Sequence, residues 1–252
     1  MARIRQQQPV RLLHVNHGLR PLGREIPLYD RPMRNATLLC TLLFAMAAGL
    51  PGQGPQVLID NDQARVVKAV DQPHAKGQPH GHKLNRVMIY LSPGRQEITP
   101  QGGKPAVLEF KAGDVKWSPA SGMHVSEITS NQPVTMVEVE LKAPGGPAGK
   151  VNVALDPVKV DPRDYKIEFE NSQVRVLRVR IGAHQKVPLH EHTLNRAVVY
   201  LTAQNGIMTS PDGKTETAQH KAGEVSWAGA AKHREENLRE GPFEAVVVEF
   251  KN

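Results

Sequence analysis

Two pairs of histidines in this chain have the residue type and the spacing of metal ligands. His80 and His82 are separated by one residue, and the same pair recurs 110 residues later as His190 and His192. In a β-strand, residues two apart face the same side, so each pair can direct two imidazoles into one cavity. Imidazole nitrogens are common ligands of transition metals. Each pair therefore predicts two ligands of a metal site.

A third histidine accompanies each pair. His124 and His233 correspond to one another at an offset of 109 residues. We therefore predict six metal ligands in two sets of three, His80, His82 and His124 in the first set and His190, His192 and His233 in the second. Three imidazoles would leave coordination positions open for water or a substrate. They suit Zn, Fe, Mn, Ni, Cu or Co about equally well, so the pattern predicts a divalent transition metal of unspecified identity.

The elements that must position these histidines are themselves present twice. Leu84-Asn85-Arg86 recurs as Leu194-Asn195-Arg196, and Lys111-Ala112-Gly113 recurs as Lys221-Ala222-Gly223. Self-similarity at a fixed offset indicates a duplicated unit, and each copy is long enough to form a small core of its own. We expect two domains, over residues 57–142 and 165–252, joined by a Pro/Gly-rich linker over residues 143–164.

Short β-branched runs separated by turn residues predict an all-β fold. The runs Ala64 to Val70 and Val134 to Leu141 have the partners Val174 to Ile181 and Ala245 to Phe250 in the second copy. Turn sequences such as Asn205-Gly206 lie between the runs. Many short strands in each copy favour a closed barrel or jelly roll, because closure removes exposed strand edges. Within the linker, residues 151–155 are expected to form an edge strand.

The histidines and their surroundings resemble the two motifs of the cupin superfamily, and the duplication resembles a bicupin. The first cupin motif contains His-x-His followed by Glu, and the second runs from Gly through Pro-x-Gly to His and Asn. Each copy matches the second motif in part, with Gly113, Pro119 and His124 in the first copy and Gly223, His233 and Asn237 in the second. The resemblance covers residues 57–142 and 165–252. It implies two tandem cupin-type jelly-roll barrels, each with a metal held by its three histidines.

The sequence departs from the cupin pattern at the fourth ligand, because Arg86 and Arg196 stand where the family has glutamate. A guanidinium aimed at a divalent ion would weaken its binding. One resolution is that Arg86 pairs with Glu127 and Arg196 with Glu236. Another is that the arginine receives a carboxylate or enolate of the substrate. A third is that no metal binds, and the arginine and histidines form a dry pocket for an organic anion. A purely structural salt bridge is the remaining alternative.

Three other histidines are not expected to be ligands. His74 and His184 stand at the position of the first motif's glycine and are predicted to lie in loops at the barrel mouth. His220 is predicted to be an ordinary solvated or hydrogen-bonded side chain.

The composition argues against a nucleic-acid partner in spite of a net charge of +7. Seven arginines lie in residues 1–47 beside only two acidic residues, so the remainder carries 25 basic against 23 acidic residues. A polyanion-binding surface therefore has little support. Residues 1–47 are interpreted as an upstream extension and a signal peptide that starts at Met33, and cleavage before Ala48 would remove the only cysteine, Cys40. We expect an exported, periplasmic or secreted protein, without stable membrane insertion after cleavage.

Two classes of function fit these residues. The first is a metal-dependent enzyme, dioxygenase-like or isomerase-like, that acts on a small oxygenated organic anion oriented by Arg86 or Arg196. The alternative is a non-catalytic module that binds a small anion or the metal itself without turnover. A homo-oligomer is compatible with both. No nucleophilic triad and no phosphate-binding glycine loop is present in the sequence.

Overall fold

The structure is a computed structural model that describes residues 54–145 and 151–251. The predicted extension, signal peptide and cleavage site lie outside these residues. Within them, no helix is both long and apolar enough to cross a membrane.

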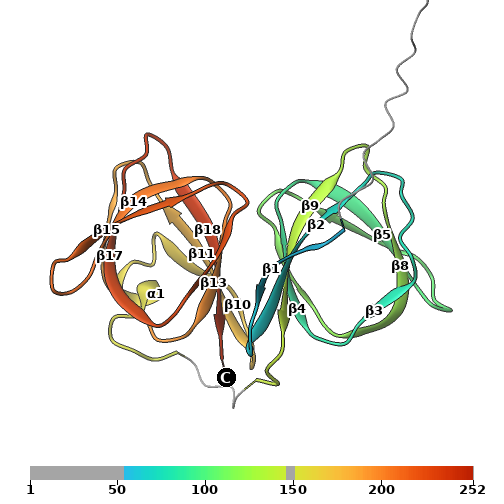
Figure 1. The fold of residues 1–252 in the computed structure, drawn as a ribbon, viewed down its shortest axis with the longest axis horizontal. Coiled ribbons are helices and arrows are strands. Elements are labelled where there is room, and N and C mark those ends of the chain that lie inside the picture. The colour runs from blue at the N-terminus through green and yellow to red at the C-terminus, as the bar shows by residue number, and fades with distance from the viewer. Residues whose placement is uncertain (1–53, 146–150, 252) are drawn as a thin grey trace, which may run out of the picture. The chain divides into compact units, whose positions relative to one another are not determined.

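The first repeat forms two antiparallel sheets, which together we call the first barrel (Figure 1). One five-stranded sheet has the order β1 (Gln56–Asp60), β2 (Ala64–Asp71), β9 (Val134–Leu141), β4 (Arg86–Tyr90) and β7 (Val115–Ser118). The four-stranded sheet has the order β3 (His80–His82), β8 (Ser121–Ile128), β5 (Gly94–Pro100) and β6 (Ala106–Phe110). This crossing strand order is that of a jelly roll.

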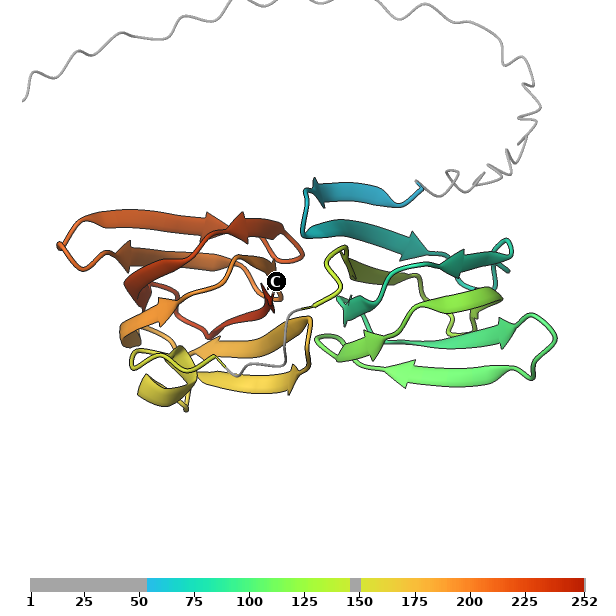
Figure 2. The same cartoon turned by 90° about the horizontal axis from the view of Figure 1, so that it is seen from below.

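The second repeat forms the second barrel with the same topology (Figure 2). Its five-stranded sheet has the order β10 (Tyr165–Glu170), β11 (Val174–Ile181), β18 (Phe243–Phe250), β13 (Arg196–Tyr200) and β16 (Val225–Ala228). Its four-stranded sheet has the order β12 (Lys186–His192), β17 (Ala231–Asn237), β14 (Gln204–Thr209) and β15 (Thr215–His220). The prediction of an all-β fold with two jelly-roll barrels is confirmed.

Each barrel has its own apolar core, which fixes the register of the strands that carry the histidines. In the second barrel, Leu177, Val187 and Phe243 belong to one buried cluster, and in the first barrel Ile128 and Met136 belong to another. A third cluster contains residues of both repeats. A one-residue slip would move such a side chain to the opposite face of its sheet, so burial of these residues specifies the register.

Two histidines of the described residues have a backbone conformation that is typical of glycine. His74 and His184 have φ values of 56° and 54°, and they are the non-glycine residues with positive φ in the described part of the chain. The left-handed region is costly for most side chains. Both residues lie in the turns before β3 and β12, as predicted, and His74 Nε2 is 3.1 Å from Asn131 Oδ1.

The prediction of an edge strand over residues 151–155 is wrong. The described part of the linker instead contains one short helical turn, α1 (Pro157–Val160). Asp156 caps this turn, because its Oδ1 accepts a hydrogen bond from the Val158 amide at 3.2 Å, and proline at the first helical position lacks the amide that would otherwise be unsatisfied. The segment is still tied to the second barrel by one backbone hydrogen bond, from Glu191 to Leu155.

Candidate metal centres

The six predicted histidines come together in two groups of three. In the first barrel, His80 and His82 on β3 meet His124 on β8, and in the second, His190 and His192 on β12 meet His233 on β17. Within each group the candidate ligand nitrogens all lie within 4.8 Å of one another, so each group could hold a metal ion. The pairing register explains the convergence, because His80 lies opposite His124 and His190 lies opposite His233.

The second group is buried and has the hydrogen bonds of a metal site. His190, His192 and His233 are 0%, 3% and 8% exposed. His190 Nδ1 donates to the Pro188 carbonyl at 2.9 Å, and His192 Nδ1 donates to Glu249 Oε1 at 2.7 Å. These partners accept only, so both rings carry the proton on Nδ1. His192 Nε2 is then free as a ligand, whereas His190 Nε2 lies 3.3 Å from the Tyr165 hydroxyl, which a bound ion would have to displace. The donor set of the second barrel therefore fits a divalent transition metal.

The first group fits a metal less well, because an arginine occupies one of its ligand nitrogens. His80 Nδ1 donates to the Gln78 carbonyl and His124 Nδ1 to the Gly122 carbonyl, which leaves both Nε2 atoms free. His82 Nε2, however, accepts a hydrogen bond from Arg86 Nη1 at 2.9 Å. Burial and the neighbouring Arg86 lower the pKa of His82 to about 4. An ion at this site would have to displace the guanidinium from His82.

Arg86 is tied back by a carboxylate, although not by the predicted one. Its Nη1 donates to Glu138 Oε2 at 2.7 Å and its Nη2 donates to Ser118 Oγ at 2.9 Å. The predicted partner Glu127 is wrong because it lies on β8 in the opposite sheet. Glu138 lies on β9, the strand paired with β4, so its side chain reaches the same cavity.

Arg196 has no such partner, and the predicted pairing with Glu236 is wrong as well. Glu236 forms an ion pair with Lys186 at 3.2 Å. Arg196 Nη1 donates to the Gly229 carbonyl, and no carboxylate of the described residues lies within ion-pair distance of its guanidinium. Val247 occupies the position that corresponds to Glu138. The second barrel thus holds a buried guanidinium whose pKa is lowered by burial.

Each barrel contains a cavity that reaches its histidines. The first cavity, of about 710 Å³, is lined by all three histidines of its group together with Arg86 and Glu138. The second cavity, of about 340 Å³, is lined by His192, His233 and Arg196 but not by His190. Most of the remaining wall of the second cavity is apolar, with Val179, Val198, Met208, Phe243 and Val247 among its residues. Volumes of this size accept small organic molecules.

Solved structures that superpose on this chain agree with the jelly-roll topology of its two barrels. No protein-family model and no curated protein matches the sequence. Oxalate decarboxylase from Bacillus subtilis, in one of its variants, superposes with a TM-score of 0.55 at 16% identity, covering 81% of this chain and 74% of that one. AerE from Microcystis aeruginosa superposes with a TM-score of 0.54 at 13% identity, covering 79% and 98%. The fold is a duplicated cupin fold.

Identities this low show the fold of the cupin barrels alone. A further Bacillus subtilis oxalate decarboxylase structure, described for its Mn(II) centres, superposes with a TM-score of 0.53 at 16% identity, covering 76% of this chain and 70% of that one. Manganese is among the metals that the three-histidine pattern accommodates.

Sequence reasoning missed three polar residues that line the second cupin cavity, Tyr165, Gln204 and Glu235. Glu235, on β17 two residues after His233, is buried, and its carboxylate accepts hydrogen bonds from Gln204 at 2.7 Å and from the Tyr165 hydroxyl at 3.3 Å. Burial raises the pKa of Glu235 to about 7. The period of two along β17 after His233 is a signal that could have placed Glu235 inside the barrel. In the first barrel the corresponding residue is Ser126.

His220 is a hydrogen-bonded side chain, one of the two roles expected for it. Its ring stacks on Tyr200 with centroids 4.0 Å apart and lines the second cavity. Its Nδ1 lies 2.7 Å from Glu224 Oε1. His220 is therefore a hydrogen-bonded wall residue of the cupin barrel.

The buried histidines predict that the metal-free protein is sensitive to mild acid. Burial lowers the pKa of His190 to about 4 and of His233 to about 2. The unfolded chain binds these protons below about pH 6.5 and the folded chain does not, so the free energy of unfolding is greatest above that pH and falls below it. We expect each buried histidine to cost chelator-treated protein about 2 kcal/mol between pH 7.5 and pH 5. Glu235 offsets part of this loss, because its raised pKa makes the folded state bind a proton over the same range.

Urea unfolding at several pH values measures this loss. In His190→Gln the free energy of unfolding should depend less on pH, whatever its value at pH 7.5. A free energy of unfolding that stays constant from pH 7.5 to pH 5 would contradict the prediction.

Proposed function

We propose that this protein is an exported duplicated cupin that binds a divalent transition metal through three histidines in each barrel. We further propose that the second barrel takes a small oxygenated organic anion beside its metal. The observation that supports this most directly is that His192, His233 and Arg196 line one cavity of about 340 Å³. The export part of the proposal rests on the sequence of residues 33–47.

Arg196 is the residue to which we assign recognition of the anion. Its guanidinium is buried, lines the cavity and lacks a carboxylate partner among the described residues, so a bound carboxylate would supply the missing countercharge. Guanidinium groups bind carboxylates through two parallel hydrogen bonds, which would fix the orientation of the anion. The apolar wall would exclude water around it. A bound metal would act as a Lewis acid or oxygen activator.

For the first barrel, binding without turnover is the better-supported role. Arg86 is neutralised by Glu138, and its hydrogen bond to His82 competes with a metal for the same nitrogen. Its cavity is about twice as large as the second and its histidines are more exposed. We therefore expect a weaker metal site in the first barrel.

Elemental analysis of the purified full chain tests the metal part of the proposal. We expect up to two metal ions per chain, with the second barrel filled first during titration because its ligands are preorganised. His192→Ala should remove the tighter site and leave the weaker one, whereas His82→Ala should do the opposite. If the purified chain contains no transition metal and takes up none during titration, the proposal is wrong.

A further inference from the structure

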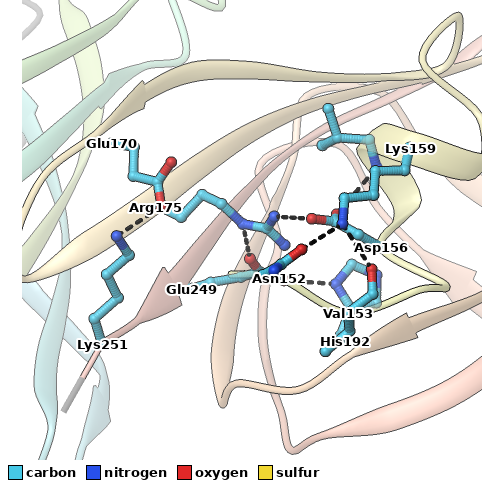
Figure 3. Close-up of polar contacts among 10 residues, drawn as sticks. Asn152, Val153, Asp156, Lys159, Glu170, Arg175, His192, Glu249 and Lys251 are labelled. Carbon is cyan, nitrogen blue, oxygen red and sulfur yellow. Dashed lines mark hydrogen bonds and ion pairs between the residues drawn. The ribbon is translucent and has the colours of Figure 1, made fainter. Parts of the chain in front are cut away.

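The linker carboxylate of Asp156 forms the outer end of a chain of contacts that reaches a candidate metal ligand (Figure 3). Arg175 Nη1 donates to Asp156 Oδ2 at 2.8 Å, and Arg175 Nε donates to Glu249 Oε2 at 2.6 Å. The other carboxylate oxygen of Glu249 accepts from His192 Nδ1 at 2.7 Å. All four side chains are buried, with between 0% and 4% of each residue exposed.

The charges of this series of contacts offset the repulsion between Arg196 and a cation at His192. Two carboxylates face one guanidinium, so the group of Asp156, Arg175 and Glu249 carries a net charge of −1 beside the imidazole. Without Asp156, Arg175 and Glu249 would form a neutral pair, and the carboxylate of Glu249 would be drawn more strongly toward Arg175 than toward His192. A carboxylate that accepts from a ligand histidine fixes its tautomer and makes the ligand nitrogen more basic.

The first barrel shows what the same strands do without a linker carboxylate. Arg65 and Glu140 lie opposite one another on β2 and β9, as Arg175 and Glu249 do on β11 and β18. Arg65 Nη1 donates to Glu140 Oε2 at 3.0 Å. No hydrogen bond joins Glu140 to His82 within the described residues, and His82 instead bonds to Arg86. Within the described residues, a carboxylate of this arginine–glutamate pair therefore contacts a candidate ligand histidine in the second barrel and not in the first.

The fold of the linker holds Asp156 in place. Its Oδ1 caps α1 while its Oδ2 receives Arg175, so one side chain serves both the helical turn and the ion pair. Lys159 on α1 donates to Asn152 Oδ1 at 2.8 Å and to the Val153 carbonyl at 3.1 Å, which closes the segment on itself (Figure 3). The carboxylate thus has little freedom to leave Arg175.

We propose that Asp156 is a positioning residue for the second metal site, acting through Arg175 and Glu249 to hold His192 with its proton on Nδ1 and its Nε2 toward the ion. The metal itself rests on the proposed function, whereas the tautomer of His192 does not depend on it. The linker is then a functional part of the second barrel rather than only a connection between repeats.

The variant Asp156→Asn tests this proposal in the full chain. Asparagine caps helices as well as aspartate does, so the helical turn is kept while the charge is removed. In metal-free protein, nitrogen–proton correlation spectra should show His192 as the Nδ1–H tautomer, and the Nε2–H tautomer should become detectable in the variant. Titration with Mn²⁺ or Co²⁺ should give about tenfold weaker binding at the second site and no change at the first.

Glu140→Gln is the matched control, because it breaks the equivalent ion pair of the first barrel without touching a ligand histidine. It should leave the His192 signals and the affinity of the second site at their wild-type values. The proposal is overturned if Asp156→Asn keeps the wild-type tautomer and affinity, or if it weakens both metal sites equally. If the wild-type chain binds neither these ions nor any other divalent transition metal, the proposed function fails, and the tautomer measurement still decides whether Asp156 positions His192.

Discussion

Replacing Arg175 with methionine should lower the free energy of unfolding by about 3–5 kcal/mol, the range typical of removing one partner from a buried ion pair. Arg175 is 2% exposed, and its two carboxylate partners, Asp156 and Glu249, are 4% and 0% exposed. Burial by itself would raise the pKa of Glu249, but hydrogen bonds from His192 and Arg175 outweigh it and hold that pKa below its usual value. Methionine would leave both carboxylates buried without a cation.

Arg65→Met is the matched comparison provided by the duplication. The Arg65 side chain is 37% exposed and that of Glu140 is 20% exposed, so solvent screens the pair. Exposed ion pairs contribute roughly 0–1 kcal/mol. Urea unfolding of both variants at pH 7.5 measures the difference. Equal losses for Arg65→Met and Arg175→Met would show that burial of the second pair does not determine its contribution.

Replacing Arg196 with glutamine should weaken binding of a small carboxylate by about 10- to 100-fold, which corresponds to losing a charged hydrogen bond worth roughly 1.5–3 kcal/mol. Oxalate and acetate are suitable probes, measured by isothermal titration calorimetry on metal-loaded and metal-free protein. The variant should fold normally, because it removes a buried charge that has no carboxylate partner among the described residues. A glutamine amide can also donate to the Gly229 carbonyl.

Arg86→Gln is the control for this experiment. Since Glu138 already neutralises Arg86, its loss should leave carboxylate affinity within about twofold of wild type, well below the cost of a charged hydrogen bond. The same variant should strengthen metal binding in the first barrel, because it frees His82 Nε2. If Arg196→Gln binds carboxylates with wild-type affinity, Arg196 does not recognise the anion. If Arg86→Gln loses most of its carboxylate affinity, the anion site is in the first barrel.

The sequence by itself determined the all-β architecture and the two groups of histidines. The duplication made this possible, because a histidine pair with a third histidine at a matching distance occurs twice. Strand periodicity then placed His80 and His82, and likewise His190 and His192, on one face. These are local regularities, and the physical rule behind them is the alternation of side chains along a strand.

Only the tertiary structure decided how the two arginines differ. Arg86 faces Glu138 and Arg196 does not face a carboxylate, because the strand beside it carries Val247 at that position. The contact between Asp156 and Arg175 likewise depends on how the linker turns back onto the second barrel. Such partners lie far apart in the chain, and which residue faces a given guanidinium depends on strand pairing and on the path of the linker. The duplicated sequence therefore predicted two similar sites, whereas the tertiary structure pairs the arginine of one site with a carboxylate and buries the arginine of the other without one.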